Sequence, residues 1–209
     1  MGEPYVFGVA NVRGTGNSGS TDATQNVYVF KMDSTGNVVE DELINTPDTP
    51  SADFATSLRL GANGVLYVTG KTDGRFDDEN NQGGDDGFVV KMYRDNLGPI
   101  WTRMYGESGN DEIADCVEDS AGYLRILKTI FPLGDTNTVQ IVTVAGSNGD
   151  VVNTGGYGVI PIPVGFTPVQ NYGVSLDVDP VSKDVYVAVN YREVVDSPQF
   201  FALFRAGTS

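Results

Sequence analysis

The chain repeats itself at an interval of about 60 residues, and this period restricts its fold more than any other feature. Residues 27–33 (VYVFKMD) return 60 positions later as residues 87–93 (GFVVKMY). Residues 5–8 (YVFG) return at a shift of 62 as residues 67–70 (YVTG). A fixed period of this size predicts an array or a propeller, in which each unit buries its face on its neighbours.

One complete unit can be read between residues 87 and 129. Residues 88–92 form a short apolar strand, and residues 100–105 alternate apolar with polar side chains, as a half-buried strand does. Two further strands are predicted near residues 113–118 and 123–127, with Gly, Asn and Asp in the turns before them. Four short antiparallel strands joined by such turns are typical of one propeller blade.

The predicted fold is therefore an all-β, β-propeller-like array of four-stranded antiparallel blades, about three and a half of them, in a single repeat domain spanning residues 1–209. Residues 160–168 are expected to form a loop at the top or edge of the third blade, because their three prolines lack the amide hydrogens of a central strand. The predicted elements are an orphan strand 5–10, a blade 27–70, a blade 87–129, a diverged blade 139–189 and an orphan strand 200–204.

This incomplete set of blades leaves two explanations open. Propellers usually close with about four to eight blades, and unpaired edge strands favour aggregation unless they are covered. The chain is then either a portion of a longer protein or one half of a ring that two copies complete.

The composition is strongly acidic, with 28 Asp and Glu against 13 Lys and Arg, a net charge of −15 and no histidine. Such a surface repels phosphate backbones and anionic lipids, so we expect neither a nucleic-acid partner nor binding to a membrane surface. The absence of histidine removes the usual general base near neutral pH and the commonest zinc ligand.

Signals for membrane insertion and export are not evident in the sequence. No apolar run approaches the length of about 18 residues that a membrane-spanning helix needs. The first five residues lack the basic and apolar regions of a secretory signal. The single cysteine, Cys116, permits no intrachain disulfide, and we expect it to be a small apolar side chain within a strand.

Several residues of the central repeat form a recognisable pattern. Residues 83–92 (GGDDGFVVKM) are followed by Trp101, by residues 105–106 (YG) and by residues 110–111 (ND). With this pattern the chain resembles the SBBP repeat, a β-propeller repeat of bacterial and some algal surface proteins. The resemblance is strongest over residues 53–129, and the third copy lacks the Lys and Trp landmarks.

The resemblance implies a propeller that belongs to a large secreted or cell-surface protein, and hence an extracellular or cell-surface location. It implies no catalytic residues, so none are carried over. The expected partners are proteins or glycans at the cell surface, or other copies of the chain, whereas the net charge and the lack of a long apolar run lead us to expect no nucleic acid and no insertion into the membrane.

Residues 14–19 (GTGNSG) match the dinucleotide-binding fingerprint in letters only. The fingerprint needs a helix directly after it, because the helix N-terminus holds the pyrophosphate, whereas here a strand rich in Val and Tyr follows. Alignment of the repeats places this stretch in the same loop as residues 73–86, which is predicted to join one blade to the next. We therefore expect no nucleotide cofactor at this loop.

The loop of residues 73–86 is rich in oxygen ligands. Hard cations such as calcium need several such ligands from a loop that can wrap around them, although the spacing here is not that of an EF-hand. Two interpretations stand, a solvated acidic loop and a calcium site, whereas a second acidic group at residues 107–115 is more simply explained by turn formers. The candidate calcium ligands are Asp73, Asp77, Asp78, Glu79, Asp85 and Asp86.

These features predict a non-enzymatic structural or interaction module, which presents its inter-blade loops to a protein or glycan partner. One alternative is self-assembly through edge strands 5–10 and 200–204 into a closed dimer or a filament. Another is a sugar-binding or glycoside-cleaving propeller, and cleavage would require two acids about 5–10 Å apart beside a cleft. Trp101, Tyr105 and Tyr123 are expected to pack between blades rather than to bind sugar.

Overall fold

The computed structural model describes residues 4–15, 23–44, 46, 51–76, 79–131, 137–152, 158–160, 170–192 and 199–206. Within these ranges the regular structure consists of strands and one short 3-10 helix, η1 (Ala62–Gly64), which confirms the all-β prediction. None of the described residues form a helix long and apolar enough to cross a membrane. The strands are β1 (Val6–Thr15), β2 (Ala23–Met32), β3 (Val38–Ile44), β4 (Asp53–Leu60), β5 (Val65–Thr72), β6 (Asp86–Tyr93), β7 (Pro99–Tyr105), β8 (Asn110–Glu118), β9 (Tyr123–Phe131), β10 (Thr138–Ala145), β11 (Gln170–Val178), β12 (Val185–Arg192) and β13 (Gln199–Ala206).

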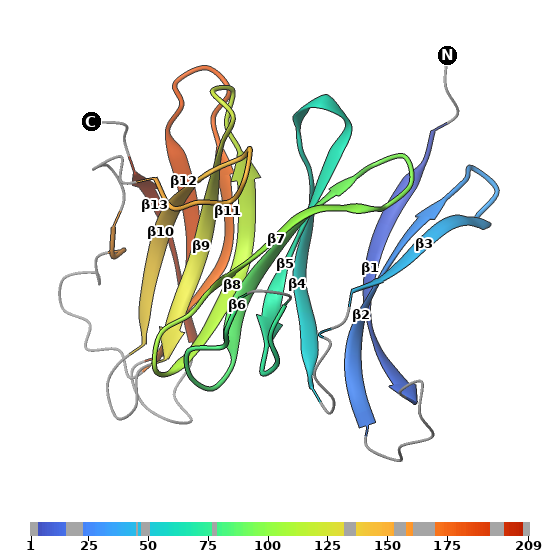
Figure 1. Cartoon of the computed structure of the whole chain (residues 1–209). Helices are drawn as coiled ribbons and strands as arrows, with labels where there is room; N and C mark the ends of the chain where they lie inside the picture. The colour runs from blue at the N-terminus through green and yellow to red at the C-terminus, as the bar shows by residue number, and fades with distance from the viewer. Residues whose placement is uncertain are drawn as a thin grey trace.

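The strands form four antiparallel sheets, which follow one another in chain order (Figure 1). We name them the first sheet (β1-β2-β3), the second sheet (β4-β5-β6-β7), the third sheet (β8-β9-β10) and the fourth sheet (β11-β12-β13). In Figure 1 they run from the blue first sheet at one end of the molecule to the orange and red strands of the fourth sheet at the other. Stacked antiparallel sheets of this kind confirm the predicted propeller-like array of blades.

The strands are grouped into sheets differently from the prediction. The predicted blades 27–70, 87–129 and 139–189 each combine the last strands of one sheet with the first strands of the next. The predicted orphan strands 5–10 and 200–204 belong to β1 and β13, which pair along their length with β2 and β12. The predicted repeat length was therefore correct, but the predicted start of each unit was wrong by two strands. Apolar periodicity does not show which turns join strands of one sheet and which lead to the next sheet.

Two loops that were predicted to join neighbouring blades connect strands of one sheet instead. β1 and β2 pair as far as Thr15 and Ala23, so the glycine-rich stretch 14–19 starts at the end of a hairpin, and most of it lies outside the described residues. β5 and β6 pair as far as Thr72 and Asp86, so the acidic loop between them belongs to the second sheet.

The first strands of three sheets carry a β-bulge at the same position. The pairing register of β4, β8 and β11 shifts just before Ser57, Asp115 and Ser175, respectively. These three residues are therefore structural equivalents, separated by 58 and 60 positions. Because bulges are positioned features of a strand rather than random defects, their recurrence identifies β4, β8 and β11 as the starts of the repeated unit.

Asp115 joins these three first strands to one another. Its carboxylate accepts hydrogen bonds from the Ser57 hydroxyl at 2.8 Å and the Arg59 Nε at 2.8 Å, both on β4. From β11 it accepts the Ser175 hydroxyl at 2.7 Å and the Leu176 N–H at 3.0 Å. Burial alone would raise the pKa of Asp115, but the hydrogen bonds from Arg59, Ser175 and Leu176 together lower it.

Apolar side chains fill the space between neighbouring sheets, and adjacent residues of one strand face opposite neighbours, as the pleat requires. Cys116 is a fully buried free thiol in the core between the second and third sheets, which confirms its predicted place, and burial raises its pKa well above the usual value. The three cores include Val27, Val29, Leu66, Val68 and Phe88 (first and second sheets), Tyr67, Val89, Ile113, Leu124 and Ile126 (second and third sheets), and Leu127, Ile141, Leu176, Val187 and Val189 (third and fourth sheets).

Candidate functional site

In the first two sheets an aromatic ring covers a glycine of the neighbouring strand. Gly8 on β1 pairs with Phe30 on β2, and Gly70 on β5 pairs with Phe88 on β6. A Cβ atom added at Gly8 would lie 2.3 Å from a Phe30 ring carbon, and one at Gly70 would lie 2.6 Å from a Phe88 ring carbon. We call this ring over a glycine the aromatic plug. The Phe88 plug is fully buried in the core facing the first sheet, where its centroid lies 5.3 Å from that of Phe76.

The third sheet has two polar side chains in place of the aromatic plug. Lys128 on β9 pairs with Gln140 on β10. Lys128 also pairs with the last residue before the bulge of β8, just as Gly70 pairs with the last residue before the bulge of β4. Ile126, two positions earlier on the same face of β9, packs in the core shared with the second sheet. Lys128 and Gln140 therefore occupy the plug position and face the second sheet.

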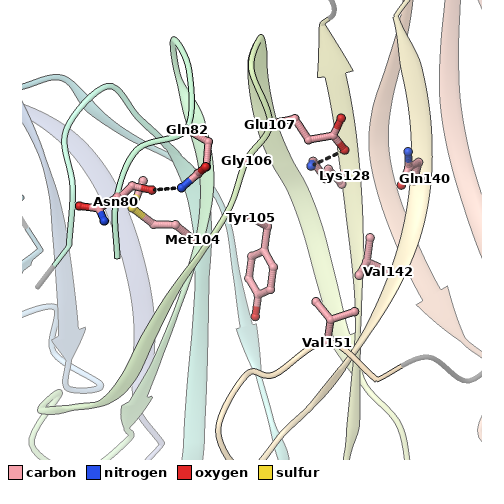
Figure 2. Close-up of a pocket in the computed structure, with 10 residues that line it drawn as sticks. All are labelled: Asn80, Gln82, Met104, Tyr105, Gly106, Glu107, Lys128, Gln140, Val142 and Val151. Carbon is pink, nitrogen blue, oxygen red and sulfur yellow. Dashed lines mark hydrogen bonds and ion pairs between the residues drawn. The ribbon is translucent and has the colours of Figure 1, made fainter. Parts of the chain in front are cut away.

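A pocket of about 340 Å³ lies at this position, between β7 of the second sheet and β9 and β10 of the third (Figure 2). Its volume is at the lower end of the range of about 300–1,000 Å³ for ligand pockets, which suits a single small ligand. The lining residues are Asn80, Gln82, Met104, Tyr105, Gly106, Glu107, Lys128, Gln140, Val142 and Val151.

One end of the pocket is apolar. Figure 2 shows Tyr105, Val142 and Val151 grouped at this end. The Tyr105 hydroxyl donates a 2.7 Å hydrogen bond to the Gly149 carbonyl, which fixes the ring in place. Burial raises the pKa of Tyr105, so its phenol remains protonated and neutral. The tyrosine thus offers the pocket a ring of fixed orientation.

The opposite end of the pocket is charged. Lys128 is 6% exposed, and its ammonium lies 3.1 Å from Asp111 Oδ1 and 3.5 Å from Glu107 Oε1. Asp111 is fully buried, and its second oxygen accepts the Glu107 N–H at 2.7 Å. The side chain of Glu107 is 60% exposed, so it is the solvent-facing partner of the lysine.

Amide side chains complete the polar lining. Gln82 donates to the Asn80 carbonyl at 3.1 Å, and both residues lie in the loop between β5 and β6 (Figure 2). Gln140 lies beside Lys128 on the adjacent strand. Within the described ranges, no residue hydrogen-bonds the side-chain amides of Asn80 and Gln140, which leaves each with donor and acceptor groups for a ligand.

A buried carboxyl group lies directly behind the pocket wall. Asp86 is fully buried, and a Cβ atom added at Gly106 would lie 2.0 Å from its Oδ1. Oδ2 accepts the Gln82 N–H at 2.5 Å, whereas Oδ1 has no hydrogen-bond partner among the described residues. Burial raises the pKa of Asp86 and the nearby charge of Asp111 adds to this, against the opposing effects of the Gln82 N–H and Lys128.

The predicted calcium ligands have separate partners in the structure. Asp73 accepts the Ala52 N–H at 2.7 Å, Glu79 lies 3.2 Å from Arg103, and Asp85 lies 2.9 Å from Lys71. Asp86 is buried as described above, and Asp77 and Asp78 lie outside the described residues. Within the described ranges no three acidic, histidine or cysteine side chains are grouped as metal ligands. A calcium ion at this loop stays a prediction, testable by the response of the unfolding temperature to calcium and chelator.

The aromatic predictions have mixed outcomes. Trp101 and Tyr105 pack against the core between the second and third sheets, as expected, and Tyr105 also lines the pocket. Tyr123 was expected to pack between blades but is 36% exposed, because it begins β9 beside a surface turn. Lys128 and Gln140 were not predicted as functional residues, although the lysine within the largely apolar run 126–131 (ILKTIF) was an available signal.

The fold and the pocket define a class: an all-β, propeller-like protein with a small polar pocket between two of its blades. No family model matches the chain, and no curated protein does. Among solved structures, the chain is similar to the crystal structure of α-L-arabinofuranosidase from Lactobacillus brevis, with a TM-score of 0.53 and 11% sequence identity. The match covers 96% of this chain and 68% of the other. At this identity the similarity concerns the fold alone.

Proposed function

We propose that this chain is a non-enzymatic binding module whose pocket between the second and third sheets holds a sugar unit of a glycan. The observation that carries the proposal is the replacement of the aromatic plug by Lys128 and Gln140, which accompanies a pocket with one apolar and one polar end. A sugar ring presents a C–H face and a set of hydroxyl groups. The Tyr105 ring can pack against the C–H face, and amide side chains that both donate and accept can hydrogen-bond the hydroxyl groups.

Two further observations support a sugar as the ligand and binding as the activity. The neighbour of similar fold is an α-L-arabinofuranosidase, a protein that acts on sugars. Cleavage of a glycosidic bond usually needs two carboxyl groups about 5–10 Å apart on either side of the bond. The ten lining residues include one carboxylate, Glu107, which lies within ion-pair distance of Lys128.

The module acts at the cell surface or in a secreted protein in this proposal. The resemblance of residues 83–111 to an SBBP repeat supports that setting, and the net charge of −15 separately disfavours nucleic acids and anionic membranes as partners. The ligand is then a glycan of a neighbouring cell or of the surrounding matrix.

The proposal is tested with a variant that introduces an aromatic plug into the third sheet. Substituting Lys128→Gly together with Gln140→Phe copies the Gly70–Phe88 pair of the second sheet and fills the pocket without disturbing the sheet register. Calorimetric titration is carried out with arabino-, xylo-, galacto- and gluco-oligosaccharides. We expect the unchanged chain to bind at least one of them, and the plugged variant to lose binding by about tenfold or more. Because Lys128→Gly leaves the buried Asp111 without its ion-pair partner, the unfolding temperature of the variant should fall, and circular dichroism at the titration temperature checks that the variant is folded.

The matched control is Gln25→Leu, which removes an amide from β2, a strand outside the pocket. This variant should bind as the unchanged chain does. Failure of the unchanged chain to bind any of the four oligosaccharides, or equal binding by the plugged variant, would contradict the proposed function.

A further inference from the structure

The charged end of the pocket holds more negative than positive charge. Lys128 is the one cation among the ten lining residues, and Glu107 is the one anion. Behind them lie two fully buried carboxyl groups, Asp111 in contact with Lys128 and Asp86 against Gly106. Asp111 and Glu107 alone thus more than balance the positive charge of the lysine, and the raised pKa of Asp86 means that its carboxyl is not needed for this balance.

This balance determines how an acidic ligand would be received. A ligand carboxylate that approached Lys128 would also approach the Glu107 carboxylate and the buried Asp111, whose charge solvent screens weakly. Asp111 already neutralises the lysine at 3.1 Å. A negatively charged sugar therefore gains little from the ammonium and is repelled by the remaining acids.

The same groups suit a pair of neighbouring hydroxyl groups. An ammonium has three donors, and the 3.5 Å separation of Lys128 Nζ from Glu107 Oε1 is longer than an ordinary hydrogen bond. Figure 2 shows the two groups at the same end of the pocket, near Gln140. One hydroxyl can accept from Lys128 while its neighbour donates to the half-exposed Glu107 carboxylate, and such bonds to charged groups are stronger than neutral ones.

We propose that the pocket selects neutral sugars by holding a vicinal diol between the Lys128 ammonium and the Glu107 carboxylate, and that it excludes acidic sugars. This inference rests on the proposed function and names the class of sugar bound. Gln140, beside the lysine, supplies a further donor or acceptor to the same ligand.

The test compares two ligands that differ in charge, galacto-oligosaccharide and galacturono-oligosaccharide of equal length, with arabino-, xylo- and gluco-oligosaccharides as further neutral probes. We expect the best neutral probe to bind at least about tenfold more tightly than the galacturonide. Glu107→Gln should weaken binding of the neutral ligand by about tenfold, because a hydrogen bond to a charged group is lost. It should also reduce the ratio of the neutral-sugar affinity to the galacturonide affinity, because the charge that repels the galacturonide is removed. Glu40→Gln on exposed β3 is the matched control and should change neither affinity.

Each contrary outcome is distinct. If a neutral sugar binds, and Glu107→Gln changes neither the affinity for that sugar nor the ratio of this affinity to that for the galacturonide, this inference is wrong while the proposed function stands. Equal or tighter binding of the galacturonide by the unchanged chain overturns the inference in the same way. If no neutral sugar binds, both this inference and the proposed function fail. The unfolding temperature of Glu107→Gln confirms that a loss of affinity does not come from unfolding.

Discussion

The ammonium group of Lys91 on β6 donates a 2.6 Å hydrogen bond to the carbonyl of Gly146, in the turn that follows β10 of the next sheet. Lys31 makes the corresponding contact one sheet earlier, donating to the Asp95 carbonyl at 3.2 Å. Each lysine also lies over a tyrosine ring, Lys31 at 4.3 Å and Lys91 at 5.4 Å from the ring centroid. The lysine that marks the repeat in the sequence thus ties consecutive sheets together.

Lys91→Met should weaken the chain by about 1.5–3 kcal/mol, because it removes a partly buried charged hydrogen bond while keeping the aliphatic stem. Urea unfolding measures the change. Lys31→Met is the matched control, and its effect should be smaller because its contact is longer and more exposed. A loss below about 0.5 kcal/mol for Lys91→Met, within the range of ordinary surface substitutions, would show that the lysine does not hold the sheets together.

Asp115→Asn should cost about 3 kcal/mol, at the lower end of the range for a broken buried ion pair, because the side chain of Arg59 remains 40% exposed. The lowered pKa of Asp115 means that its stabilising effect is complete above the unfolded-state pKa of about 3.9 and is lost as the pH falls through the folded-state value. The difference in unfolding free energy between the two proteins should therefore be large at pH 7 and shrink at pH 3. Asp95→Asn, at an exposed aspartate in a turn, should show no such difference at either pH.

Asp86→Asn should stabilise the chain at pH 8. Because burial raises the pKa of Asp86, the folded state favours the protonated carboxyl, and stability decreases as the pH rises from the unfolded-state value through the folded-state one. An asparagine keeps an acceptor for the Gln82 N–H and carries no charge. Thermal unfolding at pH 4 and pH 8 should show a gain at the higher pH and little change at the lower. A lower midpoint for the variant at pH 8 would mean that the charged carboxylate stabilises the fold.

Gly70→Ala should destabilise the second sheet by about 1–3 kcal/mol, the usual cost of overpacking. The added Cβ would lie 2.0 Å from the backbone oxygen of Phe54 and 2.6 Å from the Phe88 ring, and the backbone cannot move aside easily. Gly158→Ala is the control, because a Cβ there meets nothing within 4 Å. Equal unfolding midpoints for the two variants would contradict the close packing of the aromatic plug.

Part of the candidate site could be predicted from the sequence. The loop of residues 73–86 was singled out for its acids, and the structure uses its amides, Asn80 and Gln82, to line the pocket. Lys128 and Gln140 were not predicted to line a pocket, because the lysine in the run 126–131 was the one local signal and Gln140 resembles an ordinary strand residue. Their place facing the second sheet follows from pairing between β9 and β10 and from packing between sheets, which no local pattern encodes.

The sequence by itself determined the class of fold, the length of the repeat and the strands, because alternating side chains and turn-forming residues act over a few neighbouring positions. It also marked Lys31 and Lys91 as equivalent. Only the tertiary structure decided where each sheet begins, which side chains meet across 58 or 60 positions at Asp115, and that a lysine takes the place of an aromatic plug. These depend on contacts between distant segments, where the free energy of packing selects one grouping of strands among several that the same periodicity allows.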